Sequence, residues 1–239
     1  MSGHSKWATI HRKKGELDAQ RGKVFQKIAK EIYIAARGTN GDPDANPALR
    51  AVIEKARANN MPRDNIQRAI DKATGNGDQE NYESIRYEGY GSGGAAIMID
   101  CLTDNRNRTA MLVRSTLTKK GGNLGTDGSV SYLFDRKGVI EIDKSIDMDT
   151  IMMAALDNGA DDIIEDDECY IIYTNSDDLL KVKDALEQVG VKEFSTCEVS
   201  FVAKNPIELD DENTEKVMEL VSMLEDIDDV QAVYHNLDI

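Results

Sequence analysis

The stretch GVIEIDKSIDMDTIMMAALDNGADDIIEDDECYIIY, residues 138–173, carries most of a complete α/β unit. Its apolar periodicity, continued to residue 202, predicts strand, helix, strand, strand, helix and strand at Val139–Ile142, Met148–Asn158, Asp162–Glu165, Cys169–Tyr173, Asp177–Val189 and Glu193–Phe201. The order β-α-β-β-α-β is typical of the ferredoxin-like arrangement. We therefore expect residues 135–204 to form one acidic domain.

The segments on either side of this unit are incomplete by themselves. Residues 205–239 predict a strand, a helix at Glu212–Glu225 and a strand at Val230–Tyr234, which is too little for a domain. Residues 79–134 predict a hairpin, a helix and a strand, at Ser84–Tyr90, Ala95–Leu102, Arg106–Lys120 and Ser129–Phe134. Joined, the two segments supply a second ferredoxin-like domain into which residues 135–204 are inserted. Simple tandem domains remain the alternative.

The N-terminal third of the chain predicts three helices. One covers Asp18–Arg37, the second begins at Asn46-Pro47, and the third ends at Gly75. The predicted fold class is therefore α+β with three domains, a helical N-terminal domain and two ferredoxin-like α/β domains, one inserted in the other. Their expected bounds are 1–78, 79–134 with 205–239, and 135–204.

The charge of the chain is strongly polarised along its length. The net charge is −15, yet residues 1–75 contain 15 Lys/Arg against 8 Asp/Glu, whereas residues 141–239 contain 6 against 28. Because salt at physiological concentration screens charges over about 8 Å, the basic and acidic segments act separately if the domains are arranged in an extended way. A polyanion is therefore expected to bind the basic end and to be repelled by the acidic end. The alternative interpretation is that the acidic part simply provides solubility.

The basic end predicts a nucleic-acid-binding surface. Residues 1–37 hold nine Lys/Arg against three acidic residues, and each phosphate contact releases counterions. Trp7 fits either of two roles, stacking on a base or anchoring the arm to the helices. The candidate contacts are the basic residues of the arm and first helix together with this tryptophan: Lys6, Trp7, His11, Arg12, Lys13, Lys14, Arg21, Lys23, Lys27 and Lys30.

Two further segments are additional candidates for phosphate contact. Arg106 and Arg108 fit either phosphate binding or surface ion pairs, and the residues alone do not choose between these roles. Lys119 and Lys120 precede a glycine-rich stretch that we expect to be a helix C-cap and flexible loop. The run Gly89–Gly94 matches G-x-G-x-x-G, but a strand follows it, so a hairpin turn is expected instead of a dinucleotide site.

Enzyme and metal-site signatures are missing from the sequence. The three histidines have no zinc-ligand spacing, no serine lies in G-x-S-x-G, and the acidic run Glu165–Glu168 fits a solvated turn. The three cysteines, Cys101, Cys169 and Cys197, indicate reduced thiols, and no segment has the length of a membrane span. We expect a cytoplasmic, non-enzymatic protein without cofactor or bound metal.

Several motifs together resemble the YebC/PmpR family. They are Gly3-His4-Ser5-Lys6-Trp7, Asn60-Met61-Pro62-Arg63-Asp64-Asn65-Ile66, Tyr87-Glu88-Gly89-Tyr90-Gly91, Thr103-Asp104-Asn105-Arg106-Asn107-Arg108-Thr109, and Gly121-Gly122-Asn123-Leu124-Gly125 with Gly128-Ser129-Val130. The resemblance covers the chain from end to end. The departures are the loop Gly38–Gly41 and the acidic third domain, which looks variable in the family.

The resemblance implies a three-domain regulator of gene expression. The family is described as probable transcriptional regulators that bind DNA, and it is similar to the mitochondrial translational activator of cytochrome oxidase subunit one. Duplex DNA and ribosomal RNA therefore both remain targets, with RNA polymerase or the ribosome as partner. A different hypothesis is a protein-interaction adaptor that uses the acidic inserted domain.

Overall fold

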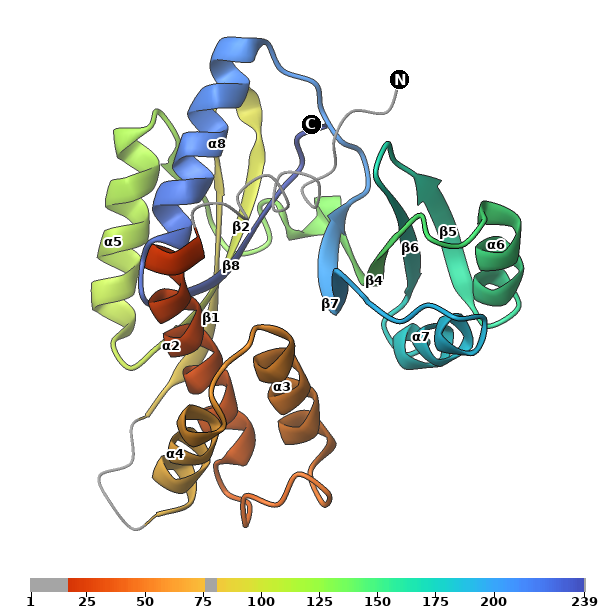
Figure 1. The fold of residues 1–239 in the computed structure, drawn as a ribbon. Helices are drawn as coiled ribbons and strands as arrows, with labels where there is room; N and C mark the ends of the chain where they lie inside the picture. Colours follow the sequence, from red (N-terminus) through yellow and green to blue (C-terminus); the bar gives the residue numbers. More distant parts are fainter. Residues whose placement is uncertain (1–16, 76–80, 239) are drawn as a thin grey trace. The chain divides into compact units, whose positions relative to one another are not determined.

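The computed structural model of the chain describes residues 17–75 and 81–238 (Figure 1). These residues form two compact units, a larger unit (17–75, 81–130 and 209–235) and a smaller unit (131–208 and 236–238). Within the described part there are seven helices and two four-stranded antiparallel sheets. None of the helices described has the length and apolar character that crossing a membrane requires.

Three helices form the first part of the larger unit: α2 (Leu17–Ala36), α3 (Pro47–Ala58) and α4 (Arg63–Thr74). The Asn46 side chain caps α3 by accepting from the Leu49 N–H at 3.1 Å, and Pro47 occupies the first turn, as expected. Apolar residues at three- and four-residue spacing face a common core that includes Ile32, Leu49 and Ile66. The three predicted helices are therefore confirmed.

The sheet of the larger unit has the order β3-β1-β2-β8, with strands β1 (Glu83–Tyr90), β2 (Ala96–Thr103), β3 (Asn123–Leu124) and β8 (Val230–His235). The Gly89–Gly94 run leads into a hairpin turn, as predicted, and Gly93 and Gly94 take φ values of 68° and 81°. Strand β8 pairs with β2 although about 130 residues separate them in sequence. The pairing shows that the C-terminal segment completes a sheet begun before residue 104.

This first sheet does not have the ferredoxin-like order that the sequence predicted for it. Its elements run β-β-α-β and then α-β, and the β1–β2 hairpin occupies the centre of the sheet. Helices α5 (Arg106–Lys119) and α8 (Asp211–Glu225) contact each other and the sheet (Figure 1). The prediction failed because β3 has only two residues, too few for a periodic pattern.

The sheet of the smaller unit has the order β5-β6-β4-β7, with strands β4 (Phe134–Asp143), β5 (Ala160–Glu165), β6 (Cys169–Asn175) and β7 (Thr196–Ala203). Helices α6 (Met148–Leu156) and α7 (Leu179–Gln188) share one core with alternate residues of the sheet, such as Ile140 and Ile172. The element order and the central β4–β6 pair are those of the ferredoxin-like arrangement predicted for this stretch.

Two predicted strands are wrong. The first is Ser129–Phe134, where residues Ser131–Leu133 form a short 3₁₀ turn and β4 begins only at Phe134. Tyr132 in this turn is 64% exposed, so these residues do not alternate between buried and exposed positions as a strand would. The strand expected after Asn205 is reduced to an isolated bridge between Ile207 and Leu237. The division into three domains stays a prediction, since the helical part and the first sheet lie in one compact unit.

Candidate nucleic-acid interface

A groove of about 1080 Å³ lies within the larger unit. One wall is a single stripe of α2, spaced three and four residues apart, and another comes from α4 and from Met61, two residues before it. The rest is supplied by Tyr82, by α5 with the preceding Asp104, and by the turn between α8 and β8. The aromatic and polar lining residues include Phe25, Lys30, Tyr33, Asn65, Arg68, Lys72, Tyr82, Asp104, Arg108, Asp226, Asp228 and Asp229.

The corner between α3 and α4 is built by a helix-ending motif. Asn60 adopts a left-handed φ of 58°, its N–H donates to the Arg57 carbonyl, and the Met61 N–H donates to the Ala56 carbonyl at 2.9 Å. This is the Schellman arrangement, in which an asparagine can replace the usual glycine. Met61 is buried, and Pro62 is the N-cap residue of α4, which begins at Arg63. The corner therefore holds the basic residues on either side of it in a defined geometry.

Three arginines at this corner and along α4 have side chains without a partner among the described residues. Arg57, Arg63 and Arg68 are exposed, and among the described residues their guanidinium groups make no hydrogen bond or ion pair. Arg68 lines the groove with Asn65 and Lys72, at the i, i+3 and i+7 spacing of one helix face. An arginine guanidinium offers a planar fork of donors that matches phosphate oxygens, so these groups are available to an external anion.

The opposite wall of the groove presents aromatic rings and an unpartnered hydroxyl. Tyr33 is only 3% exposed, yet its hydroxyl has no hydrogen-bond partner in the described part of the chain. Its ring meets that of Tyr82 edge to face, with the centroids 5.6 Å apart, and the Lys30 amine lies 5.7 Å from the Tyr82 centroid. A buried hydroxyl without a partner is costly, so a polar group entering the groove would satisfy it.

The lysines predicted on the first helix are occupied by groups of the same chain. The Lys23 amine lies 2.9 Å from Asp226, Lys27 donates to the Glu225 carbonyl at 2.8 Å, and Lys30 donates to the Asp228 carbonyl at 2.8 Å. Burial lowers the pKa of the Lys27 amine, and the nearby carboxylates of α8 oppose that effect. A phosphate would have to displace these contacts, so the role of these lysines in nucleic-acid binding stays a prediction.

The side chain of Asp229 is the centre of a buried polar cluster. It lies 2.7 Å from the Arg108 guanidinium, 2.8 Å from the Thr109 hydroxyl and 3.1 Å from the Lys30 amine. Burial by itself would raise the pKa of Asp229, but the hydrogen bonds from Arg108, Thr109 and Lys30 outweigh it and hold the pKa below its usual value. This carboxylate thus joins α2 to α5 and the start of β8.

The two arginines that the sequence left ambiguous have different surroundings. Arg108 pairs with Asp104 and Asp229, both at 2.7 Å, and these hydrogen bonds raise its pKa further. The ion-pair interpretation therefore describes Arg108 in this structure. Arg106 is exposed in the first turn of α5, where its carbonyl accepts from the Tyr87 hydroxyl at 3.2 Å. Nucleic-acid contact by either residue stays a prediction.

The glycine-rich stretch after α5 is anchored instead of being a flexible loop. Glu88, which is 3% exposed, accepts the N–H groups of Gly128 and Val130 through its carboxylate and that of Gly125 through its carbonyl. These backbone donors are therefore already engaged by Glu88, two by its carboxylate and one by its carbonyl, and are not free for phosphate. Lys120 pairs with Glu219, whereas Lys119 is exposed.

The remaining predicted contacts lie outside the described residues. This holds for Lys6, Trp7, His11, Arg12, Lys13 and Lys14, and for the side chain of Arg21, whose backbone belongs to α2. They stay predictions. Sequence reasoning had also passed over Arg57, Arg63 and Arg68. The basic balance of residues 1–75 was the available signal, but it did not show which cations are paired.

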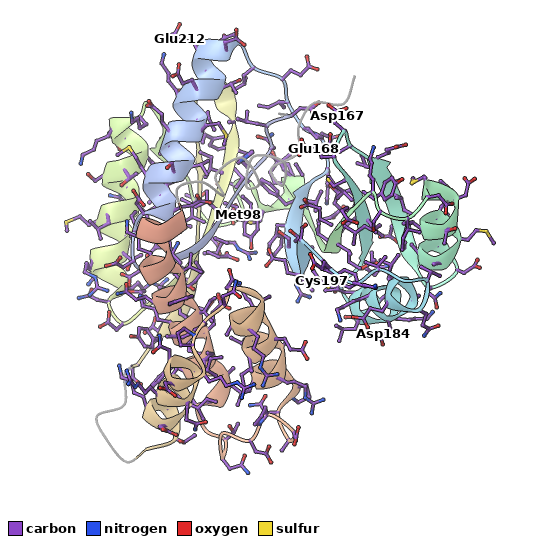
Figure 2. The ribbon with its side chains drawn as sticks, in the orientation of Figure 1. Met98, Asp167, Glu168, Asp184, Cys197 and Glu212 are labelled. Atoms are coloured by element: carbon purple, nitrogen blue, oxygen red, sulfur yellow. The ribbon has the colours of Figure 1, made fainter. Side chains whose placement is uncertain are left out.

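The described residues offer little to nucleophilic or metal chemistry. They contain no group of three His, Cys, Asp or Glu side chains placed to hold a metal ion. Asp167 and Glu168 lie in the turn between β5 and β6 (Figure 2). The three cysteines are free thiols, and burial raises the pKa of Cys101 to about 12 and that of Cys169 to about 11. High pKa values keep both thiols protonated and unreactive at neutral pH.

Comparison with protein families covers nearly the whole chain. The description "TACO1/YebC protein N-terminal domain" matches residues 5–76, and "TACO1/YebC second and third domain" matches residues 82–237. The first match contains the helices α2 to α4, and the second contains both sheets.

Individual relatives agree with this match. A "Probable transcriptional regulatory protein" of Geobacillus thermodenitrificans is 52% identical over 100% of this chain and 97% of its own length. The "Probable transcriptional regulatory protein YebC" of Escherichia coli is 54% identical over 100% and 97%. The crystal structure of a conserved hypothetical protein from Aquifex aeolicus superposes with a TM-score of 0.87 at 44% identity, covering 98% of this chain and 97% of that one. The chain belongs to the TACO1/YebC family.

Proposed function

We propose that this chain is a nucleic-acid-binding regulator of transcription that contacts duplex DNA through its helical N-terminal part. The observation that carries the proposal is that the exposed guanidinium groups of Arg57, Arg63 and Arg68 have no partner within residues 17–75 and 81–238. The names of the relatives support the regulatory role. The proposal is of a binding protein without catalytic activity that acts in the cytoplasm.

Charge around the groove orients the proposed contact. Asn65 and Arg68 give α4 donors that line the groove, whereas Asp226 and Asp228 place exposed carboxylates in the turn between α8 and β8. Phosphates are attracted by the first and repelled by the second. DNA is therefore expected to run along α3 and α4, and the predicted arm from Lys6 to Lys14 would add further phosphate contacts.

The test compares two triple variants of the full chain that remove the same charge. Arg57, Arg63 and Arg68 are changed to Gln in one variant, and the exposed Arg114, Lys181 and Lys192 are changed to Gln in the control. Binding to a labelled 30-base-pair duplex is measured by fluorescence anisotropy. We expect the first variant to lose about 30-fold in affinity and the control less than about 3-fold, because phosphate contacts depend on position.

Equal losses in the two variants would mean that only net charge matters and would overturn the proposed interface. Co-sedimentation with purified ribosomes is measured in parallel. If the arginine variant loses ribosome binding while its DNA affinity is unchanged, the target is structured RNA and the DNA proposal is wrong. Changing Arg12, Lys13 and Lys14 to Glu tests the arm by the same two measurements.

A further inference from the structure

Helix α6 of the smaller unit has an unusual solvent face. Its sequence, MDTIMMAAL, has only Asp149 and Thr150 as polar residues. Ile151 and Ala155 are buried, but Met152, Met153 and Leu156 are 38%, 69% and 47% exposed. A surface helix normally buries its apolar stripe and presents polar residues to water. In α6 both the buried face and the solvent face are apolar. The exposed Met152, Met153 and Leu156 on the solvent face are called the apolar strip.

The apolar strip continues onto α7. Leu180 is 63% exposed in the first turn of α7. A Cβ placed on Gly159, just past α6, would lie 3.2 Å from the Asp178 side chain, just before α7. The end of α6 and the start of α7 are therefore adjacent, and Leu156 and Leu180 lie at the same end of this helix pair. Contiguous exposed apolar side chains of this kind mark interaction sites more often than scattered ones do.

Acidic side chains dominate the segments that carry this strip. Residues 147–189 contain 13 Asp/Glu against 2 Lys/Arg. One of the two cations, Lys183, pairs with Glu187 on its own helix, and Asp161 is paired with Lys137. Asp184 projects from α7 (Figure 2), and Asp149, Asp157 and Asp177 are exposed. The apolar strip is thus set in a strongly negative field.

We propose that Met152, Met153, Leu156 and Leu180 form a docking surface for a basic amphipathic helix of a partner protein. Methionine side chains are flexible and polarisable, so they adapt to the apolar face of an incoming helix. The surrounding carboxylates attract the basic face of the same helix and speed its association. The surface is independent of the proposed DNA contact, since it lies in the smaller unit.

The same charge argues against other occupants of the surface. Nucleic acids and anionic lipid surfaces carry the charge sign of this segment and are repelled. A second copy of the chain would bring an identical acidic surface, because residues 135–204 contain 18 Asp/Glu against 7 Lys/Arg. Like charges brought together across an interface weaken the affinity by about a hundredfold or more.

The experiment uses the full chain and a labelled 15-residue peptide of Leu and Lys, with its leucines at i, i+3, i+4 and i+7. A peptide of the same composition in scrambled order controls for charge alone. Anisotropy is measured for the wild type and for a variant with Met152→Gln and Met153→Gln. The matched control is Met111→Gln, which alters a methionine that is 65% exposed on α5 of the larger unit.

We expect the amphipathic peptide to bind the wild type and the Met111→Gln control at least tenfold more tightly than the Met152/Met153 variant. Equal binding by all three proteins, or equal binding of the scrambled peptide, would overturn the proposal. Sedimentation equilibrium of the wild type provides a second check. If the chain self-associates and the Met152/Met153 variant does not, a second copy covers the surface and the proposal is wrong.

Discussion

Helices α2 and α4 line the same groove, and three lysines of α2 differ from two arginines of α4 in what their charged groups contact. The amines of Lys23, Lys27 and Lys30 on α2 contact carboxylates and carbonyls of residues 225–229. The guanidinium groups of Arg63 and Arg68 on α4 have no partner in the described part of the chain. The difference teaches that the basic charge of a segment and its availability to a polyanion are separate properties.

The largest expected effect is a loss of stability when Asp229, which binds Lys30 of α2, loses its charge. Changing Asp229 to Asn should lower the free energy of unfolding by about 2–3 kcal/mol, because the partly buried hydrogen bonds from Arg108 and Lys30 lose their charged acceptor. Urea denaturation at pH 7 measures the loss. Asp228→Asn, one residue away and exposed, is the control and should change stability by less than about 0.5 kcal/mol. Equal losses of unfolding free energy in Asp229→Asn and Asp228→Asn would show that the contacts of the Asp229 carboxylate add no specific stability.

The next effect concerns the salt dependence of DNA binding. Replacing Arg57, Arg63 and Arg68 by Gln should reduce the slope of log affinity against log salt by about 2–3, since each phosphate contact contributes about 0.9. Replacing Lys23 and Lys27 by Gln should leave the slope nearly unchanged, because these amines are bound within the chain. Anisotropy titrations from about 50 to 200 mM salt measure both slopes. If the lysine variant loses more of this slope than the arginine variant, the lysines of α2 and not the three arginines contact the DNA.

The pH dependence of stability gives a smaller effect with a defined sign. The pKa of Asp229 is lower in the folded chain than its usual value. The stabilisation is therefore complete above the unfolded value of about 3.9 and is lost as the pH falls through the folded value. The stability difference between wild type and Asp229→Asn should be constant from about pH 5 to 7 and should shrink below about pH 4. A difference that persists at acid pH would contradict the charged state assigned to Asp229.

The smallest effect is expected at the exposed end of the α2 contacts. Lys23 and Asp226 have side chains 46% and 62% exposed, and such pairs contribute less than about 1 kcal/mol. Changing Lys23 to Met should therefore alter the unfolding free energy by only a few tenths of a kcal/mol, as measured by urea denaturation. A loss as large as that of Asp229→Asn would mean that the α2 contacts act as one cooperative network.

The predictable part of the fold follows the strength of the local pattern. Long periodic segments such as α2, α8 and β6 lie close to their predicted bounds, because many residues contribute to one periodicity. The two-residue β3 and the turn Ser131–Leu133 were missed, since their conformations depend on distant partners. Strand β3 exists because it pairs with Gly89 and Tyr90 of β1.

The candidate site was predictable only in part, for a related reason. The sequence located basic charge in the first 75 residues, but Arg108 and Lys30 are paired by Asp229, more than 100 residues away. Likewise, the backbone donors of the glycine-rich stretch are taken by Glu88, 40 residues earlier. Composition shows how many charges exist, whereas only long-range contacts decide which of them remain free.

The sequence by itself determined the α+β class, the order of elements in the smaller unit and the polarity of charge along the chain. These properties arise from local periodicity and composition, which need no partner. The tertiary structure decided the order of the first sheet, the anchoring of the loop after α5 and the difference between the engaged lysines of α2 and the exposed Arg63 and Arg68 of α4. Those depend on hydrogen bonds and ion pairs between residues far apart in the chain, whose geometry only folding fixes.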